Sequence, residues 1–287
     1  MLDLIARLLM LLNSTNMNSP EYHIAFNLLQ CLSEIPSLRI EEVAKRCFTS
    51  SATLSRFCTK LGYSNYTVFR KAVQHEMEDI EKQERNQAKI LSLPTNIALP
   101  SVLDSMLIAL RAFRASLNTK QIMNAAKEIA DSPQCVIMGP DIVQPAILDF
   151  QIKMYMAGKN ITFQKSIPID SIEESGQILD KDTLLIYLFP VNRLLSTNLE
   201  LVRTTSALFK MPCRKLLVTA SQEVEIFLPD ANIISLPTVP NQFNEQSTSL
   251  LSLQCALEMV YVAFRHLLAQ RAQDAFRSEK DRTGEDN

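Results

Sequence analysis

Glycine is scarce in this chain of 287 residues, which contains only five, and no two of them lie within three residues of each other. The phosphate loops of P-loop nucleotidases and of dinucleotide-binding proteins need clustered glycines, because their backbone N–H groups must approach phosphate oxygens closely. The sequence therefore contains neither type of loop.

Histidine and cysteine are also few, and they form no metal-binding pattern. The three histidines are far apart, and the six cysteines contain no pair with the CxxC spacing of zinc or redox sites. We therefore expect no metal, no cofactor and no catalytic residue. The cysteines are interpreted as reduced, buried apolar side chains, and a nucleophilic cysteine is the alternative.

Long apolar runs are lacking too. The stretch from Leu250 to Phe264 is interrupted by Gln254 and Glu258, short of the roughly 20 apolar residues of a membrane span. The N-terminal run MLDLIARLLMLLN contains Asp3 and Arg7 and lacks a signal-peptide cleavage site, so it predicts an amphipathic helix. We expect a cytoplasmic protein with no membrane partner.

Positive charge is concentrated in one part of the chain. Residues 37–75 contain seven basic side chains against two acidic ones, although the whole chain carries a net charge of −2. A basic module in an acidic protein is typical of nucleic-acid binding, and a solvated helix face is the alternative.

The sequence of the basic module and its flanks predicts four helices. We predict them from Ser19-Pro20 to about Glu34, from Ile40 to Cys47, from a Ser50 cap to Leu61, and from a Ser64 cap to about Ile90. The second and third, joined by a turn at Phe48-Thr49, have the spacing of a helix-turn-helix. A tri-helical protein-interaction domain has the same pattern and is the alternative.

The third helix is the predicted DNA-reading element. Its apolar side chains recur at helical spacing, which leaves short polar groups and cations on the outer face. The predicted DNA-contacting residues are Ser50, Ser51, Ala52, Thr53, Ser55, Arg56 and Lys60, with Lys45 and Arg46 on the preceding helix.

The segment IEEVAKRCFTSSATLSRFCTKLGYSNYTVFRKAV resembles the N-terminal domain of the RpiR/MurR family of bacterial transcriptional regulators. Seven positions match the family's recognition-helix string: Ser50, Thr53, Arg56, Phe57, Leu61, Gly62 and Tyr63. The resemblance implies a regulator of carbohydrate-metabolism genes that binds a double-stranded DNA operator. Phe48 departs from the family, which usually has glycine or another small residue in the turn, and we expect its ring to pack over the domain surface.

Beyond residue 100 the pattern changes to alternating strands and helices. Apolar runs predict strands at Cys135–Met138, Asn160–Gln164, Thr183–Phe189, Arg214–Thr219 and Asn232–Leu236. The predicted fold is an all-α helix-turn-helix domain followed by an α/β domain with a parallel sheet of about five strands. The predicted boundaries are 1–78 for the first domain, 79–105 for a helical and proline-containing linker with its hinge at Pro94 and Pro100, 106–275 for the second domain and 276–287 for a flexible tail.

The segments VIMGPDIVQPAILDFQIKMYMAGKNI and SLLSLQCALEMVYVAF resemble a SIS (sugar isomerase) domain. The resemblance implies two phosphosugar-binding loops, but both depart from the family. The first has Asp141 and Val143 in place of glycine and serine, and the second reads Leu188-Phe189-Pro190-Val191-Asn192-Arg193. A carboxylate repels phosphate, so we expect ordinary phosphosugar binding to be lost. The residues left for an effector are Gly139, Asp141, Asn192 and Arg193, and a phosphate site rearranged around Asn192 and Arg193 is the alternative.

These features predict a DNA-binding transcription regulator, not an enzyme. We expect a homodimer or homotetramer, because the first helix is apolar and the last, from about Asn244 to Gln270, is long. The sequence does not decide whether a small-molecule effector, such as a sugar derivative, is bound. The alternatives are a SIS-type isomerase, for which Glu245 or Glu258 is the candidate base, and an adaptor that binds proteins instead of DNA.

Overall fold

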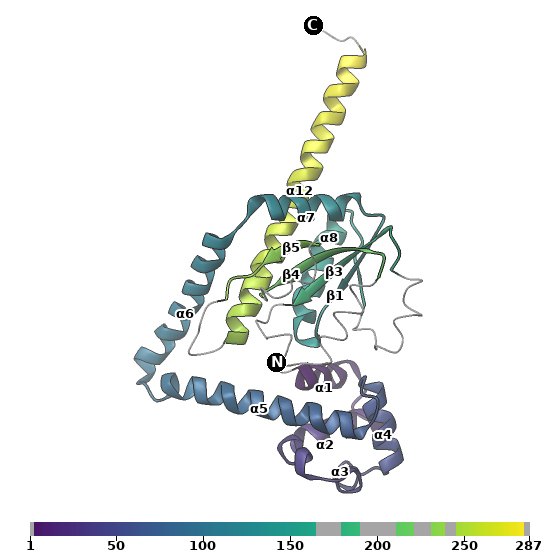
Figure 1. Cartoon of the computed structure of the whole chain (residues 1–287), viewed down its shortest axis with the longest axis vertical. Helices are drawn as coiled ribbons and strands as arrows, with labels where there is room; N and C mark the ends of the chain where they lie inside the picture. The colour runs from purple at the N-terminus through teal and green to yellow at the C-terminus, as the bar shows by residue number, and fades with distance from the viewer. Residues whose placement is uncertain (1–2, 165–178, 190–210, 221–230, 239–244, 284–287) are drawn as a thin grey trace. The chain divides into compact units, whose positions relative to one another are not determined.

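The computed structural model describes residues 3–164, 179–189, 211–220, 231–238 and 245–283 (Figure 1). These residues form two compact units, one up to Leu99 and one from Pro100 onward. The first unit is helical, and the second contains all the described strands. The fold class predicted from the sequence is therefore confirmed.

The first unit consists of five α-helices and one 3₁₀ helix: α1 (Asp3–Ser14), α2 (Pro20–Gln30), η1 (Leu32–Ser37), α3 (Ile40–Arg46), α4 (Ser51–Lys60) and α5 (Tyr66–Leu91). The prediction of one α-helix reaching Glu34 was wrong, because α2 ends at Gln30 and the chain continues as η1 with Pro36 inside it. The cap of α5 is Asn65 and not Ser64, since the Asn65 side chain accepts a hydrogen bond from the backbone N–H of Val68.

The amphipathic N-terminal helix packs into the core of its own domain. Leu4 and Leu8 of α1 are almost fully buried and belong to the same apolar cluster as Leu28, Leu54 and Phe69. The prediction that this helix supplies a subunit contact was therefore wrong for its main apolar face. An amphipathic pattern shows that one face is covered, but not by which chain.

The second unit is built on a five-stranded parallel sheet with the order β2-β1-β3-β4-β5. The strands are β1 (Gln134–Met138), β2 (Thr162–Phe163), β3 (Thr183–Phe189), β4 (Arg214–Thr219) and β5 (Asn232–Ser235). All five lie where the apolar runs predicted them, although β2 is shorter. In this order the chain reverses its winding between β1 and β3, which is where ligands bind in open α/β sheets.

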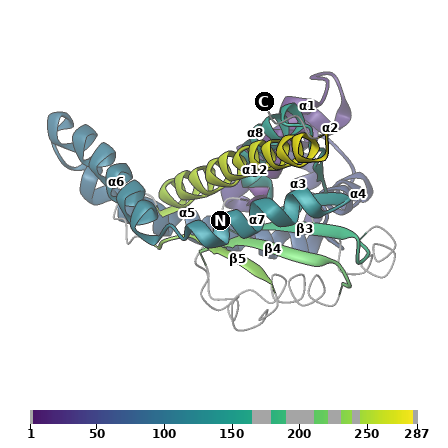
Figure 2. The same cartoon turned by 90° about the horizontal axis from the view of Figure 1, so that it is seen from above.

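Three helices cover one face of the sheet: α7 (Thr119–Asp131), α8 (Gln144–Met156) and α12 (Glu245–Thr283) (Figure 2). Alternate strand residues face them, such as Cys135 and Ile137 of β1, while Val136 and Met138 join an apolar cluster on the other face. Burial on both faces explains why the strands read as continuous apolar runs.

Two helices differ from the sequence predictions. The last helix continues to Thr283, so residues 276–283 of the predicted flexible tail are helical. Helix α6 (Thr95–Ser116) contains Pro100, which was taken as a hinge residue. By length and composition α6 is one described helix that could cross a membrane, with only 11% of its most apolar window buried. This apolar run was not predicted. A single such helix is weak evidence for a span.

Candidate nucleic-acid interface

Helix α4 begins at a well-formed cap. The Ser50 hydroxyl accepts a hydrogen bond from the backbone N–H of Thr53 at 3.1 Å and lies 2.9 Å from the Thr53 hydroxyl oxygen. Serine at this position satisfies one of the free N–H groups of the first turn. The cap fixes the end of the helix that carries most of the predicted base-contacting side chains.

The outer face of α4 carries short side chains at its N-terminal end and cationic side chains toward its C-terminal end. Leu54, Phe57 and Cys58 are buried in the domain core. Ser50, Ala52, Arg56 and Lys60 are exposed, and Ser51, Thr53 and Ser55 are partly exposed. The predicted residues of α4 thus share one accessible face. Short side chains on such a face let a helix approach base edges closely.

Thr59 also lies on this face, although it was not among the predicted residues. Thr59 is exposed, and its hydroxyl donates to the carbonyl of Ser55 at 3.2 Å. Its position one turn after Ser55 was the signal available in the sequence, because residues four apart share a helix face.

Two of the predicted phosphate-contacting cations already pair with carboxylates. Arg46 lies 2.5 Å from Glu34, and Lys60 lies 2.5 Å from Glu21. Both pairs are substantially exposed, so each is held weakly in water. A phosphate must compete with these carboxylates for Arg46 and Lys60. Lys45 is exposed at the end of α3.

The turn between α3 and α4 has an unusual backbone. Phe48 has φ 53°, in the left-handed region that favours glycine. The predicted packing of its ring over the domain surface was wrong, since Phe48 is 88% exposed. The Thr49 N–H bonds to the Ala44 carbonyl at 2.9 Å, which closes the turn despite the residue type.

Two cysteines that are distant in sequence meet inside this domain. The thiol of Cys47, at the end of α3, donates to the sulfur of Cys31, at the end of α2, and this hydrogen bond together with the charge of Arg46 lowers the pKa of Cys31 to about 7. The same interaction and burial raise the pKa of Cys47. Both side chains are buried, as predicted, but they form a pair that sequence spacing did not reveal.

The loop after β1 holds the first predicted effector residues. A Cβ atom on Gly139 would lie 2.7 Å from a methyl group of Val143, so glycine is required by the valine packed against it. Asp141 is buried, and its carboxylate accepts a hydrogen bond from the Gln144 side chain. An apolar side chain and a buried carboxylate thus occupy the loop where the SIS resemblance implies glycine and serine. Asn192 and Arg193 lie outside the described residues, as does Glu245 as far as its side chain is concerned.

The candidate base Glu258 is engaged in an ion-pair network. Lys153 of α8 lies 2.5 Å from Glu258 of α12 and 2.8 Å from Asp149, which also accepts from Gln254 at 2.7 Å. Lys153 lowers the pKa of Asp149, and the two carboxylates raise the pKa of Lys153. The arrangement joins two helices, which is a structural role.

Comparison with protein families identifies the first domain. Residues 7–79 match the model of the helix-turn-helix domain of the rpiR family. No curated protein has a sequence that matches this chain.

Several solved structures have a similar chain path. The Vibrio vulnificus NanR protein, complexed with ManNAc-6P, is 14% identical over 97% of both chains with a TM-score of 0.46. The sugar isomerase domain of an RpiR transcription factor from Sphaerobacter thermophilus is 13% identical over 63% of this chain and 96% of that one, with a TM-score of 0.46. A putative sugar-phosphate isomerase from Listeria monocytogenes is 12% identical over 62% and 94%, with a TM-score of 0.49.

Proposed function

We propose that this chain, a DNA-binding transcription regulator whose residues 7–79 form a helix-turn-helix domain of the RpiR family, reads an operator with the outer face of α4. The observation that carries the proposal is the accessible face of α4, where Ala52 and Arg56 stand one turn apart behind the Ser50 cap. Short side chains approach the bases, and Arg56 reaches a base edge or a phosphate.

Basic residues around α4 hold the domain on the phosphate backbone. Lys45 and Arg46 lie at the C-terminal end of α3, and Lys60 lies at the end of α4. Contacts of this kind fix the register of a protein on the duplex without reading sequence. The weak pairs of Arg46 with Glu34 and of Lys60 with Glu21 exchange for phosphate on binding.

The second domain serves assembly and effector binding and not catalysis. Val143 and the buried carboxylate of Asp141 stand in the loop after β1, and Glu258, the described candidate base, is held by Lys153. The chain acts in the cytoplasm as a homodimer or homotetramer on genes of carbohydrate metabolism. Its effector is a sugar derivative less anionic than a hexose phosphate.

A selection experiment tests DNA reading. The full chain is used to select duplexes from a random double-stranded DNA pool, and the enriched sequences are compared with those selected by Arg56→Ala. We expect the wild type to enrich a pseudo-palindromic site with half-sites one helical turn, or a multiple, apart. If the wild type enriches no sequence more strongly than Arg56→Ala does, α4 does not read DNA, and the protein-binding adaptor is favoured.

Calorimetric titration with hexose and amino-sugar phosphates tests the second domain. We expect no binding in the micromolar range. Micromolar binding that Arg193→Ala abolishes shows a rearranged phosphate site. Turnover of any of these sugars contradicts the assignment as a regulator without enzymatic activity.

A further inference from the structure

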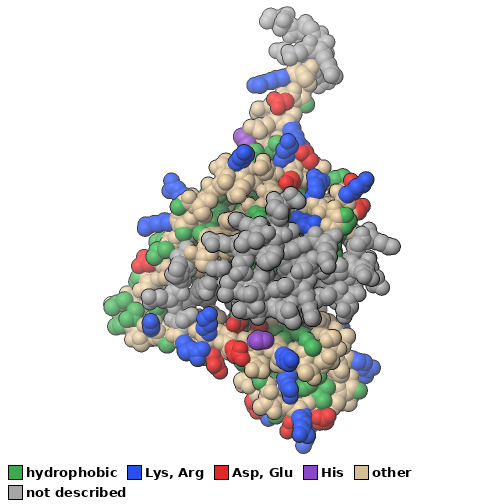
Figure 3. Space-filling view, in the orientation of Figure 1, with side chains coloured by type: hydrophobic (Ala, Val, Ile, Leu, Met, Phe, Trp, Pro, Cys, Tyr) green, Lys and Arg blue, Asp and Glu red, His purple; other side chains and the backbone are tan. Residues whose placement is uncertain are grey.

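Helix α6 exposes an unusual amount of apolar surface. Leu99 and Leu103 are each more than 60% exposed, and Leu107 and Ile108 are about half exposed. Figure 3 shows apolar side chains gathered at the surface on the side where α6 lies in Figure 1. Its contacts with the described core of its own unit come from its last turns, where Phe113 is buried. A contiguous apolar surface of this kind on a helix marks an interaction site.

The spacing of these side chains indicates that the missing partner is another helix. Leu99, Leu103, Met106 and Leu110 follow one another at steps of four, three and four residues, and Leu117 lies seven residues further on. Such a repeat of 3.5 residues lays an apolar seam along one side of a helix, where a second helix packs. A lipid surface sets no such period.

The charges on α6 favour a second copy of the same helix running the other way. Asp104 and Arg111 lie two turns apart, at equivalent positions of the repeat. In an antiparallel pair with Met106 opposite Leu110 of the partner, each Asp104 is level with Ala112 of the other copy and one residue from its Arg111. In a parallel pair in register, the two Asp104 side chains lie on opposite sides of the pair, and neither meets an arginine. The surface is thus self-complementary about a two-fold axis, as a symmetric dimer contact requires.

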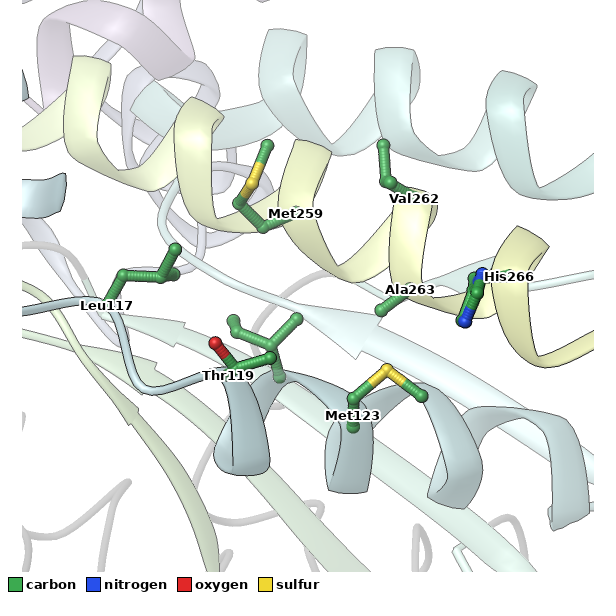
Figure 4. Close-up of a pocket in the computed structure, with 8 residues that line it drawn as sticks. Leu117, Thr119, Met123, Met259, Val262, Ala263 and His266 are labelled. Carbon is green, nitrogen blue, oxygen red and sulfur yellow. The ribbon is translucent and has the colours of Figure 1, made fainter.

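The two-fold axis of this α6 pair also brings the start of the partner's α6 to an apolar groove between α7 and α12. Between α7 and α12 lies an apolar cavity of about 260 Å³, and side chains of both helices face it (Figure 4). Its lining includes Leu117, which continues the α6 seam, together with Met123, Met259 and Val262. With Met106 opposite Leu110, Leu99 of one copy is level with Leu117 of the other. Without the groove, the subunit contact would consist of the paired α6 helices alone, each about 33 Å long. The groove enlarges this contact.

We propose that α6 forms the two-fold subunit contact of this protein, pairing antiparallel with α6 of a second copy and ending against its α7/α12 groove. The proposal rests on the proposed function and deepens it by placing the dimer contact on α6, which begins at Thr95 and continues into the second unit, instead of on α1. It also gives the regulator the two-fold symmetry that a pseudo-palindromic operator needs.

Sedimentation equilibrium of the full chain at micromolar concentration tests the contact. We expect a dimer, or a tetramer made of two dimers, and we expect Leu103→Glu/Leu110→Glu to halve the mass. Ile108→Glu is the matched control, because Ile108 is an exposed apolar residue of the same helix but lies off the seam. Circular dichroism of each variant confirms that it is folded. A mass unchanged by the double substitution overturns the α6 contact alone, whereas a monomeric wild type overturns the proposed assembly as well.

Charge exchange tests the antiparallel direction. Asp104→Arg should raise the dimer dissociation constant several-fold, and Asp104→Arg/Arg111→Asp should restore it, because each new arginine again meets an aspartate. No restoration overturns this pairing. In a parallel flotation assay, wild-type binding to phosphatidylglycerol vesicles that Leu103→Glu abolishes overturns the proposal in favour of a membrane surface.

Discussion

The guanidinium of Arg7, in α1, donates a hydrogen bond to the backbone carbonyl oxygen of Leu61 at 2.5 Å and so attaches α1 to the C-terminal end of α4. The same group lies 5.6 Å from the centre of the Tyr63 ring. A cation at the end of a helix also interacts favourably with the helix dipole. The position of α4, the proposed DNA-reading helix, therefore depends on a helix outside the helix-turn-helix itself.

Replacing Arg7 should destabilise the first domain. Arg7→Met keeps much of the side-chain length but leaves the Leu61 carbonyl without this donor, and we expect the free energy of unfolding to fall by about 1 to 2 kcal/mol. Arg7→Lys retains the charge and should lose less. Urea denaturation of the full chain measures both, and equal stability of wild type and Arg7→Met would refute the role of this contact.

Replacing Arg56 should weaken operator binding. Arg56→Ala removes a charge and several donors together, so we expect a loss of about 1 to 3 kcal/mol on the selected duplex. Arg85→Ala is the matched control, because Arg85 is an exposed arginine on α5, paired with Glu81 and outside the helix-turn-helix. Fluorescence anisotropy measures both affinities. If the two substitutions weaken binding equally, Arg56 contributes only its charge and makes no specific contact with the DNA.

Salt should weaken the same complex steeply, because cations released from the phosphates rebind as salt rises. Lys45→Ala should reduce the slope of log affinity against log salt by about 1 while leaving the preferred sequence unchanged. Titrations at several salt concentrations give this slope. A slope that Lys45→Ala does not alter removes Lys45 from the interface.

Phe48 should be replaceable by glycine with a gain in stability. Its φ of 53° is unfavourable for a residue with a Cβ atom, and its ring is almost fully exposed. We expect Phe48→Gly to stabilise the domain by roughly 0.5 to 1 kcal/mol, after the greater freedom of glycine in the unfolded chain is subtracted. Phe48→Ala removes the same ring but keeps the strain, so its stability should stay close to that of the wild type. Identical results for the two variants would show that the turn is unstrained.

The cysteine pair should titrate near neutral pH. Because the pKa of Cys31 is lowered to about 7, one thiolate should form in the folded chain as the pH rises through 7. Ultraviolet absorbance of thiolate measures it. Cys31→Ser should abolish this step, and Cys47→Ala should move it to higher pH, because the donated hydrogen bond is lost. Cys255→Ser should leave it unchanged, since burial raises the pKa of Cys255. A midpoint that Cys47→Ala does not shift would contradict the pairing.

The sequence predicted the sheet and the helix-turn-helix well, because both depend on local patterns. The apolar residues of β3 and β4 lie on largely buried strands, and Ser50 caps α4 as serine does elsewhere. Contacts distant in sequence were not predictable in this way. Neither the approach of Cys31 to Cys47 nor that of Arg7 to Leu61 leaves a local signal.

Helix α6 was missed for a different physical reason. Pro94 and Pro100 were read as breaks, yet α6 begins directly after Pro94, and Pro100 stands in its second turn, where a proline removes only one helical hydrogen bond. For α1, the amphipathic pattern was read correctly but assigned to the wrong partner. Periodicity predicts a covered face, and only the structure shows that Leu4 and Leu8 are covered by their own domain.

The Lys153 network should stabilise the second domain over a defined range of pH. Asp149 has a lowered pKa, so its contribution is present above about pH 4, the ordinary value of a carboxyl, and is lost as the pH falls through the folded value. Lys153 has a raised pKa, so its contribution is present below about pH 10 and is lost as the pH rises beyond it.

The side chains of this network are 31 to 44% exposed, which limits the expected loss of stability in Lys153→Met to about 1 kcal/mol or less. Urea midpoints at several pH values should show a constant difference from wild type between pH 6 and 9 and a smaller one below pH 4. Lys120→Met, at an exposed lysine of α7, should show neither effect. If the two variants behave alike, then Lys153 does not join α8 to α12, and Glu258 becomes a candidate for chemistry again.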